Sequence, residues 1–388
     1  MQPPKKVWTD AEIDSTINKW IEKVRPEKVK TGDWNIKDLP FMEHNGIPRV
    51  DLWHRVHYLD ELEITWGKKW GASGLGKIRE AAVVQPKERD IQIPSMGSSP
   101  IWNIHAPKIN QPPSLKDLND WQKEHEYMVQ VLRDNDVTVH YIEYPDPLPV
   151  GPYGPHVAMT SIDFWIVWGG AILSRFGIWP QGRGREVFLS QWLTKIGCPI
   201  LLTVTGRGIC EVGAMESLAD DCMFLGSGVA ANQDGIEQVK PVLERAGITE
   251  VHTVQYGSWL ESCEFPMGGT YHISLFSGPL DIGKHLVYPP LLGWETMRWF
   301  HEKGYELVEI PPEEQRDWVP SNLIVLEPGK VMIAAEAKET IRRVRKAGVE
   351  VIECPTVTSR YKIGLGGSLR CRCKPLIRDR GPKLADMK

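Results

Sequence analysis

The chain has 388 residues, of which 41% are apolar and 25% charged, a composition typical of a soluble globular protein with a sizeable core. Its formal charge of −4 gives no footing for nucleic-acid binding, which usually depends on a basic surface. No apolar run reaches the roughly 18 residues that cross a bilayer, and the opening Met-Gln-Pro-Pro-Lys-Lys lacks the apolar segment of a signal peptide. We therefore expect a cytoplasmic protein with a small-molecule partner and no nucleic-acid or membrane partner.

Cysteine usage supports the same compartment. Seven cysteines are present, an odd number, and most lie among apolar neighbours, as reduced structural thiols do. Cys371 and Cys373 have no second cysteine or histidine pair nearby, so we expect no metal site. The run Gly-Arg-Gly-Arg at 182–185 lacks the Gly-Lys-Ser/Thr of a phosphate-binding loop. It is predicted to be a loop leading into a helix, and no cofactor is expected.

Residues 1–75 differ in pattern from the rest of the chain. Helical periodicity covers residues 10–24, and a loop-like stretch containing Trp53, Trp66 and Trp70 follows. We predict an N-terminal extension that packs on the following domain or on a neighbouring subunit. Exposed tryptophans would suit a subunit interface, so a homo-oligomer is expected.

From residue 76 onward, one unit recurs five times. It consists of an amphipathic helix, a short break that is often glycine, and a strand rich in β-branched residues. A glycine at this point is typical of a helix C-terminal cap. The successive helices and strands are predicted at residues 121–132 and 137–142, 185–196 and 199–204, 235–245 and 250–254, 294–303 and 306–310, and 338–346 and 349–353.

Short strands joined by tight turns precede four of these helices. They are predicted at residues 164–168 with 171–173, 222–225 with 229–230, 285–288, and 323–326 with 330–333, and a lone strand at 81–84 precedes the first helix. The unit thus reads strand–strand–helix–strand within one continuous α/β domain. Chance repetition of βαβ pieces in an open sheet is the alternative.

The segment with the clearest chemistry is Gly-Leu-Gly-Gly-Ser-Leu-Arg-Cys-Arg-Cys-Lys-Pro at residues 364–375. Glycines let the backbone approach a ligand closely, and arginines on both sides of Cys371 favour its thiolate. Cys371 is therefore a candidate nucleophile, and Cys373 is a weaker one. The basic, proline-containing end of the chain, residues 381–388, is predicted to be a loose tail.

A fivefold ββαβ repeat that ends in Gly-Gly-x-x-x-Cys resembles the guanidine-modifying, or pentein, superfamily, which includes arginine deiminases, dimethylarginine dimethylaminohydrolases and amidinotransferases. The resemblance implies an α/β fold, a five-bladed α/β propeller of pseudo-fivefold ββαβ repeats, with a catalytic domain over residues 76–380. It also implies attack by cysteine on an sp2 carbon bonded to nitrogens, expulsion of a leaving group, and resolution by water or a second amine.

Carried over residue by residue, the resemblance makes Cys371 the nucleophile. It makes His272, in Tyr-His-Ile-Ser, the group that gives or takes the proton of the leaving group. The acidic motif of the family falls on Glu-Val-Gly-Ala-Met-Glu at 211–216, and its spacing does not separate Glu211 from Glu216. Glu211 is the favoured site residue because it opens the motif.

Three further residues complete the expected site. Asp163 keeps the carboxylate of a family Arg-Asp pair and would accept N–H bonds from a guanidinium or an amidine-like edge, although a turn or capping role is the alternative. Backbone amides near Gly366 and Gly367 would stabilise developing charge.

Ser274 departs from the family pattern, because deiminases and amidinotransferases carry a carboxylate there that helps to hold a cationic substrate. A hydroxyl removes one negative charge from the site, so a guanidinium should bind less well. The chain also has sixteen tryptophans against eight phenylalanines, and tryptophan stacks well on flat rings. Together these features indicate a neutral, flat substrate such as 2-nitroimidazole, with nitrite as the leaving group. Dimethylarginine dimethylaminohydrolases also lack that aspartate, so a guanidine substrate stays open.

The predicted function is a hydrolase of C–N bonds that works through a covalent cysteine intermediate on a guanidine compound or a neutral planar analogue. One alternative is an amidinotransferase, which the length, the N-terminal extension and residues 318–333 favour. The other is a non-catalytic binding protein, for which the loss of charge at Ser274 is the argument.

Overall fold

The computed structural model describes residues 56–92, 114–145, 150–151, 154–155, 162–177, 182–255, 272–359, 367 and 369–387, together with isolated positions between 9 and 19. Within these residues, five three-stranded sheets share one topology. An inner strand runs antiparallel to a middle strand, and the middle strand runs parallel to an outer strand. The α/β fold of repeated ββαβ units that the sequence predicted is confirmed.

Each sheet uses the same three kinds of strand. The inner strands are β5 (Phe164–Val167), β8 (Met215–Ala219), β11 (Ser277–Asp281), β14 (Ile324–Glu327) and β17 (Cys373–Arg378). The middle strands are β6 (Gly170–Leu173), β9 (Cys222–Ser227), β12 (Lys284–Val287), β15 (Lys330–Ala334) and β1 (Ile78–Val83). The outer strands are β7 (Ile200–Thr203), β10 (Glu250–Gln255), β13 (Glu306–Glu309), β16 (Glu350–Cys354) and β2 (Thr138–Tyr141).

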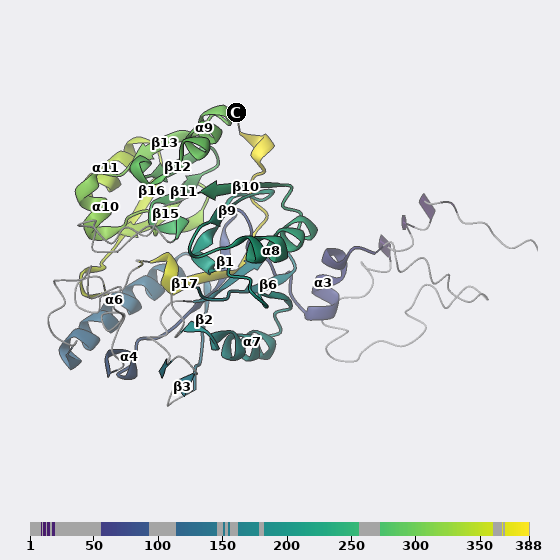
Figure 1. Ribbon diagram of the computed structural model, residues 1–388, viewed down its shortest axis with the longest axis horizontal. Helices are drawn as coiled ribbons and strands as arrows, with labels where there is room; N and C mark the ends of the chain where they lie inside the picture. Colours follow the sequence, from purple (N-terminus) through teal and green to yellow (C-terminus); the bar gives the residue numbers. More distant parts are fainter. Residues whose placement is uncertain are drawn as a thin grey trace, which may run out of the picture.

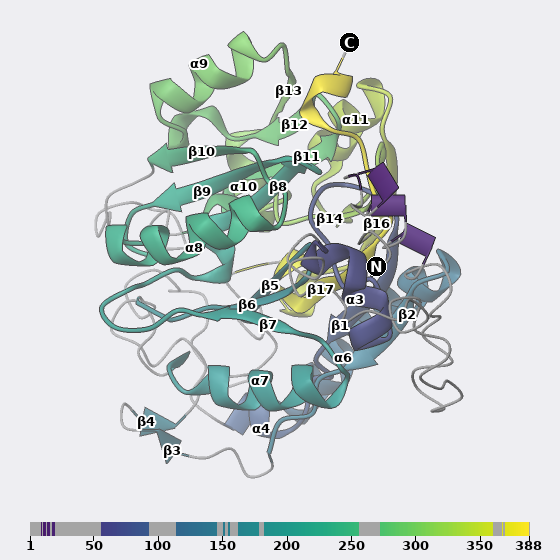
Figure 2. The ribbon, with the colours of Figure 1, turned by 90° about the vertical axis from the view of Figure 1, so that its right-hand side faces the viewer.

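A helix connects each middle strand to its parallel outer strand, because parallel neighbours need a crossover. These helices are α7 (Arg185–Lys195), α8 (Gln233–Arg245), α9 (Trp294–Glu302), α11 (Lys338–Lys346) and α6 (Leu115–Asp134). They lie on the outside of the sheets (Figure 1), and a view at right angles shows the same arrangement (Figure 2). The remaining short elements are α3 (Tyr58–Trp66), α4 (Arg89–Gln92), α10 (Pro312–Trp318) and the strands β3 (Val150–Gly151) and β4 (Gly154–Pro155).

Helix termination follows the glycines that the sequence placed there. Gly197, Gly247, Gly304 and Gly348 follow four of the crossover helices, and all have φ between 76° and 84°. This left-handed conformation closes a helix at little cost for glycine. After α6 the left-handed residue is Asp136, with φ of 61°.

Pairing of β1 with β17 completes the fifth sheet. Val83 lies opposite Cys373 and Ile78 opposite Arg378, so strands from the two ends of the chain share one ladder. The sequence predicted β1 as a lone strand, because its partner follows the glycine-rich segment almost 300 residues later. The nucleophile candidate Cys371 therefore stands at the start of the strand that closes the repeat.

The third unit corrects one predicted strand pair. The strand at 222–225 was expected to pair with 229–230, but β9 pairs with β8, which precedes it. All five residues of β8 are buried, whereas Val229 is 41% exposed. Residues 228–231 form a tight turn instead, in which Gly228 donates to the Ala231 carbonyl.

Both ends of the described chain are tied to the domain. Leu62 and Trp70 are buried in the core of the second unit, so residues 56–75 pack on the domain. The helix expected over 10–24 falls largely outside the described residues, and the described positions within it are helical. The tail was predicted to be loose, but it is fixed through residue 387. Gly381 donates to Asp220 at 2.9 Å, and Leu384 donates to Asp221 at 2.8 Å.

Within the described residues, none of the helices is long and apolar enough to cross a membrane.

The two faces of α9 give a stability test with an internal control. Phe300 is fully buried against Phe224 and Tyr305, while Trp294 is 74% exposed on the same helix. Phe300→Ala should lower the free energy of unfolding by about 3–5 kcal/mol. Trp294→Ala should change it by less than about 0.5 kcal/mol. Urea denaturation measures both, and equal effects would contradict this packing.

Candidate active site

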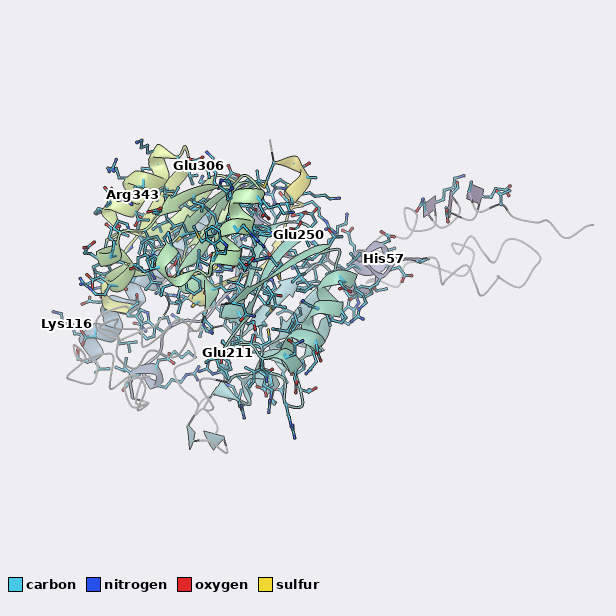
Figure 3. The ribbon with its side chains drawn as sticks, turned by 45° about the horizontal axis from the view of Figure 1, so that its top comes forward. His57, Lys116, Glu211, Glu250, Glu306 and Arg343 are labelled. Atoms are coloured by element: carbon cyan, nitrogen blue, oxygen red, sulfur yellow. The ribbon has the colours of Figure 1, made fainter. Side chains whose placement is uncertain are left out.

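The starts of the five inner strands each carry a residue with chemical capability. These residues are Asp163 before β5, Glu211 before β8, His272 before β11, Asn322 before β14 and Cys371 before β17. Because the five units repeat one topology, all five residues lie at the same end of their inner strands. Figure 3 shows Glu211 within the body of the fold, whereas Lys116 and Arg343 lie at its periphery.

Cys371 lies in a short 3₁₀ turn over Arg370–Arg372, which leads directly into β17. Its side chain is partly exposed, unlike those of the other described cysteines, which are buried. The Asn322 side-chain amide donates to its sulfur at 3.3 Å, and the Cys371 backbone N–H donates to the Asn322 Oδ1 at 3.3 Å. The Asn322 side chain therefore holds both the backbone and the sulfur of the nucleophile candidate.

Gly367 is needed beside this sulfur for a steric reason. A Cβ atom at position 367 would lie 2.3 Å from the Cys371 Sγ, closer than real contacts allow. The sequence analysis predicted that backbone amides near Gly366 and Gly367 lie close to the reacting atoms. Gly366 lies outside the described residues.

His272 is oriented by a buried carboxylate. Its Nε2 lies 2.9 Å from the Glu211 Oε2, and Glu211 is fully buried. The other Glu211 oxygen accepts the backbone N–H of Gly177 at 2.8 Å. A Cβ at Gly213 would lie 2.2 Å from the His272 ring, so this glycine makes room for the imidazole. Carboxylate and ring together form a pair suited to proton transfer.

Asn322 joins the turn of Cys371 to the turn that follows His272. Its side-chain nitrogen lies 3.3 Å from the Ser274 carbonyl oxygen and 3.4 Å from the Ser274 hydroxyl. The same nitrogen contacts the Cys371 sulfur. Ser274 is buried, so its hydroxyl helps to position the Asn322 side chain.

Asp163 forms a buried ion pair within the chain. The Arg185 Nη1 donates to its Oδ2 at 2.7 Å, and both side chains are almost fully buried. Burial raises the pKa of the Asp163 carboxyl, and the guanidinium opposes that shift. The residue before it, Ile162, donates to the Cys371 carbonyl at 3.1 Å, which fixes Asp163 close to the nucleophile turn. Arg185 thus supplies the counter-charge of Asp163.

Glu216 faces a different group from Glu211. It is fully buried on β8, where His285 Nε2 lies 3.4 Å and Arg370 Nη1 lies 3.6 Å from its Oε1. Of the two acidic residues that the motif spacing left open, Glu211 is therefore the one that contacts His272.

The two cysteines of the terminal segment differ sharply. Cys373 is 1% exposed, and burial raises the pKa of its thiol to about 12, which makes it a packing residue rather than a nucleophile. Lys374 is also buried, and burial lowers the pKa of its ammonium group to about 8, against the opposing effect of the Cys371 charge.

The tryptophans closest to the site contact cations. Trp165 has the Arg370 guanidinium 5.3 Å and the Lys374 ammonium 5.5 Å from its ring centroid. Trp168 is buried, with the Arg380 guanidinium 3.7 Å from its ring centroid. In the described structure these two rings pack against cations of the chain itself.

Among the residues that the structure describes, no three His, Cys, Asp or Glu side chains converge to hold a metal ion.

Sequence reasoning missed three residues around this site. Asn322 directly precedes the predicted strand at 323–326 and had no assigned role, and Arg185 was predicted only as the first residue of a helix. Lys374 was part of the quoted segment but had no role. The available signal was alternation along β17, which places Lys374 on a different face from Cys373.

The chain was compared with known proteins. No protein-family profile matches the chain. It is 29% identical over 374 residues to a 2-nitroimidazole nitrohydrolase from Mycobacterium sp. strain JS330, covering 94% of this chain and 97% of that protein.

Solved structures resemble it in fold. An amidinotransferase of saxitoxin biosynthesis from Microseira wollei superposes with a TM-score of 0.63 at 16% identity, over 80% of this chain and 98% of the other. DDAH from Pseudomonas aeruginosa gives 0.57 at 18% identity, over 77% and 99%. A cyanobacterial arginine dihydrolase of the ornithine–ammonia cycle gives 0.59 at 15% identity, over 78% and 98%.

The chain has the pentein fold, as its sequence predicted. Its similarity to a hydrolase along nearly all of both chains supports the predicted class, an enzyme that hydrolyses carbon–nitrogen bonds.

The contact between Asn322 and the Cys371 sulfur predicts a change in thiol reactivity. Asn322→Asp would set a carboxylate beside the sulfur, raise the pKa of the thiol and slow its alkylation by iodoacetamide at pH 7 by at least about tenfold. Mass spectrometry of the peptide containing Cys371 measures the rate. Asn135→Asp, at the far end of α6, is the control and should leave the rate unchanged. An unaltered rate in Asn322→Asp would show that the two side chains do not interact.

Proposed function

We propose that this chain is a cysteine-dependent nitrohydrolase that acts on 2-nitroimidazole or a closely related neutral nitroimidazole and releases nitrite. Support comes from the mycobacterial 2-nitroimidazole nitrohydrolase, to which the chain is similar along almost its full length. It also comes from the charge balance around Cys371, which suits a neutral ligand.

The observation that carries this proposal is that the carboxylates near Cys371 already have partners within the chain. Asp163 is paired with Arg185 at 2.7 Å, and Glu211 contacts His272 at 2.9 Å. The position that is acidic in deiminases is Ser274. Asp163 thus has its own counter-charge, and both oxygens of Glu211 are engaged within the chain, by His272 and by the Gly177 N–H. A buried cation without a counter-charge is strongly disfavoured, whereas a neutral ring meets no such penalty.

In the first half of the proposed reaction, the Cys371 thiolate adds to C2 of the nitroimidazole, which lies between two ring nitrogens. Electron density moves onto the ring and nitro group, where a proton from His272 stabilises it. Loss of nitrite with its bonding electron pair then restores the aromatic ring as a thioether on Cys371. Nitrite leaves as an anion and needs no proton.

In the second half, His272 accepts a proton from water, which attacks C2 of the thioether. The C–S bond breaks, the thiolate is regenerated, and 2-imidazolone leaves. The sum is 2-nitroimidazole plus water giving 2-imidazolone, nitrite and one proton. Glu211 keeps the His272 ring in place through both halves.

An amidinotransferase is the second candidate, favoured by the superposition on the saxitoxin-pathway amidinotransferase. The two candidates differ in the second half of the reaction, since a transferase needs an amine acceptor where a hydrolase needs only water. Turnover in buffer without an amine distinguishes them.

The central test compares two cysteines that are two residues apart. Wild type should release nitrite from 2-nitroimidazole in buffer alone, and Cys371→Ala should lose at least about 10³-fold in kcat/KM because the nucleophile is gone. Cys373→Ala is the matched control and should keep most of the activity, because its thiol is buried in the core. Nitrite is measured colorimetrically, beside citrulline release from arginine and methylated arginines. Faster turnover of a guanidine, or full activity of Cys371→Ala, would overturn the proposal.

The space for His272 gives a second test. Gly213→Ala would push the ring away from Glu211, and a displacement of this size costs about 10²-fold in kcat. Gly293→Ala, at the start of α9, introduces a Cβ that only approaches the Gln255 carbonyl at 3.3 Å and should behave as wild type. Normal turnover by a folded Gly213→Ala protein would remove His272 from the mechanism.

A further inference from the structure

A cavity lies among the five inner strands. Residues from all five inner strands or the turns leading into them line it, and residues 72–75 close it. It measures about 60 Å³. One water-sized group needs roughly 10–15 Å³ of such space, so a group of three or four non-hydrogen atoms fits, whereas a large organic ligand does not.

The lining of this cavity is cationic. Arg370, Lys374 and Arg378 contribute to it, and no carboxylate does among the described lining residues. Arg378 is committed to the structure, because it donates to the Gly76 carbonyl at 2.6 Å and to the Val325 carbonyl at 2.9 Å. Arg370 and Lys374 are the other two cations of the lining.

Lys374 and Arg370 share the Trp165 ring as a common support, with their charges 5.5 Å and 5.3 Å from its centroid. Arg370 uses its Nη2 to donate to the Met215 carbonyl at 3.2 Å. Its Nη1 forms an ion pair with the buried Glu216 carboxylate at 3.6 Å, and this nitrogen makes no hydrogen bond among the described residues. Lys374 is only 5% exposed, and its ammonium group lies over the Trp165 ring.

Two neutral donors are also unsatisfied at this cavity. The hydroxyl of Ser217, which is 5% exposed, and the indole N–H of Trp165 have no hydrogen-bond partner among the described residues. Buried donors of this kind are normally paired, and the ammonium of Lys374 offers three more. An anion is bound well where hydrogen-bond donors and positive charge meet in one small space, as they do here.

We propose that this cavity is a binding site for an inorganic anion of at most about four atoms. Lys374 and Arg370 would supply the positive charge, and Ser217 and Trp165 would donate hydrogen bonds. Nitrite has the right size and charge. That nitrite is the anion met during turnover rests on the proposed function, which would release it at Cys371, close to this cavity. Anion binding itself does not depend on turnover.

The test titrates sodium nitrite into the full-length protein by isothermal titration calorimetry, in the absence of substrate. Sodium gluconate, whose anion is too large for the cavity, keeps the ionic strength constant. We expect one saturable nitrite per chain, with binding weakened by at least about tenfold in Lys374→Met. Lys338→Met is the matched control, because Lys338 is an exposed residue of α11 paired with Glu353, and it should bind nitrite as wild type does.

A second measurement needs no variant and so does not depend on whether Lys374→Met folds. Crystals of wild type soaked in sodium bromide should show an anomalous peak beside the Lys374 Nζ. Absence of bromide from the cavity, or unchanged nitrite affinity in folded Lys374→Met, would overturn the anion site. Neither result would alter nitrite release from 2-nitroimidazole, so this site and the proposed function fail independently.

Discussion

The antiparallel pairing of β17 with β1 is the constraint on which the site depends. It completes the fifth sheet and places Cys371 just before its inner strand, as Asp163, Glu211, His272 and Asn322 lie before theirs. A single side chain, that of Asn322, then links the turn of the cysteine to the turn after the histidine. Because the units repeat one topology, the five short segments that precede the inner strands form one candidate active site, although they are far apart in sequence.

The proposed function rests on the charge balance at the starts of the inner strands. Asp163 is neutralised by Arg185, Glu211 is engaged by His272, and Ser274 carries no charge. Lys374 adds a buried positive charge near Cys371. Under the proposed function, these surroundings disfavour a guanidinium and suit a neutral ring that expels an anion. The cationic cavity extends the same electrostatic preference along the inner strands.

Much of the fold was predictable because the relevant signals are local. Helical periodicity and the glycines that follow it fixed α7, α9 and α11 to within a residue or so, and the capping glycines adopt the expected conformation. α6 begins at Leu115 rather than 121, because the capping box of Ser114 and Asp117 extends it. The partner of β1 and the fixing of the tail on Asp220 could not be read in this way, since both depend on contacts between distant segments.

The same division holds for the site. Glycine-rich sequence and the family resemblance identified Cys371, His272 and Glu211 as candidates, and the structure brings the last two into contact. The Asp163–Arg185 pair was not foreseen, because nothing in a strand and a later helix start reveals that their side chains meet. The carboxylate was recognisable from sequence, but its neutralisation, which changes the expected substrate, was not.

Covalent chemistry at Cys371 is the central claim, and rapid-quench mass spectrometry tests it most directly. Wild type mixed with 2-nitroimidazole and quenched in acid during the first turnover should carry an imidazolyl group on the peptide containing Cys371, formed together with one equivalent of nitrite. Nitrite release with no adduct on any cysteine, or with the adduct on a different residue, would contradict the account.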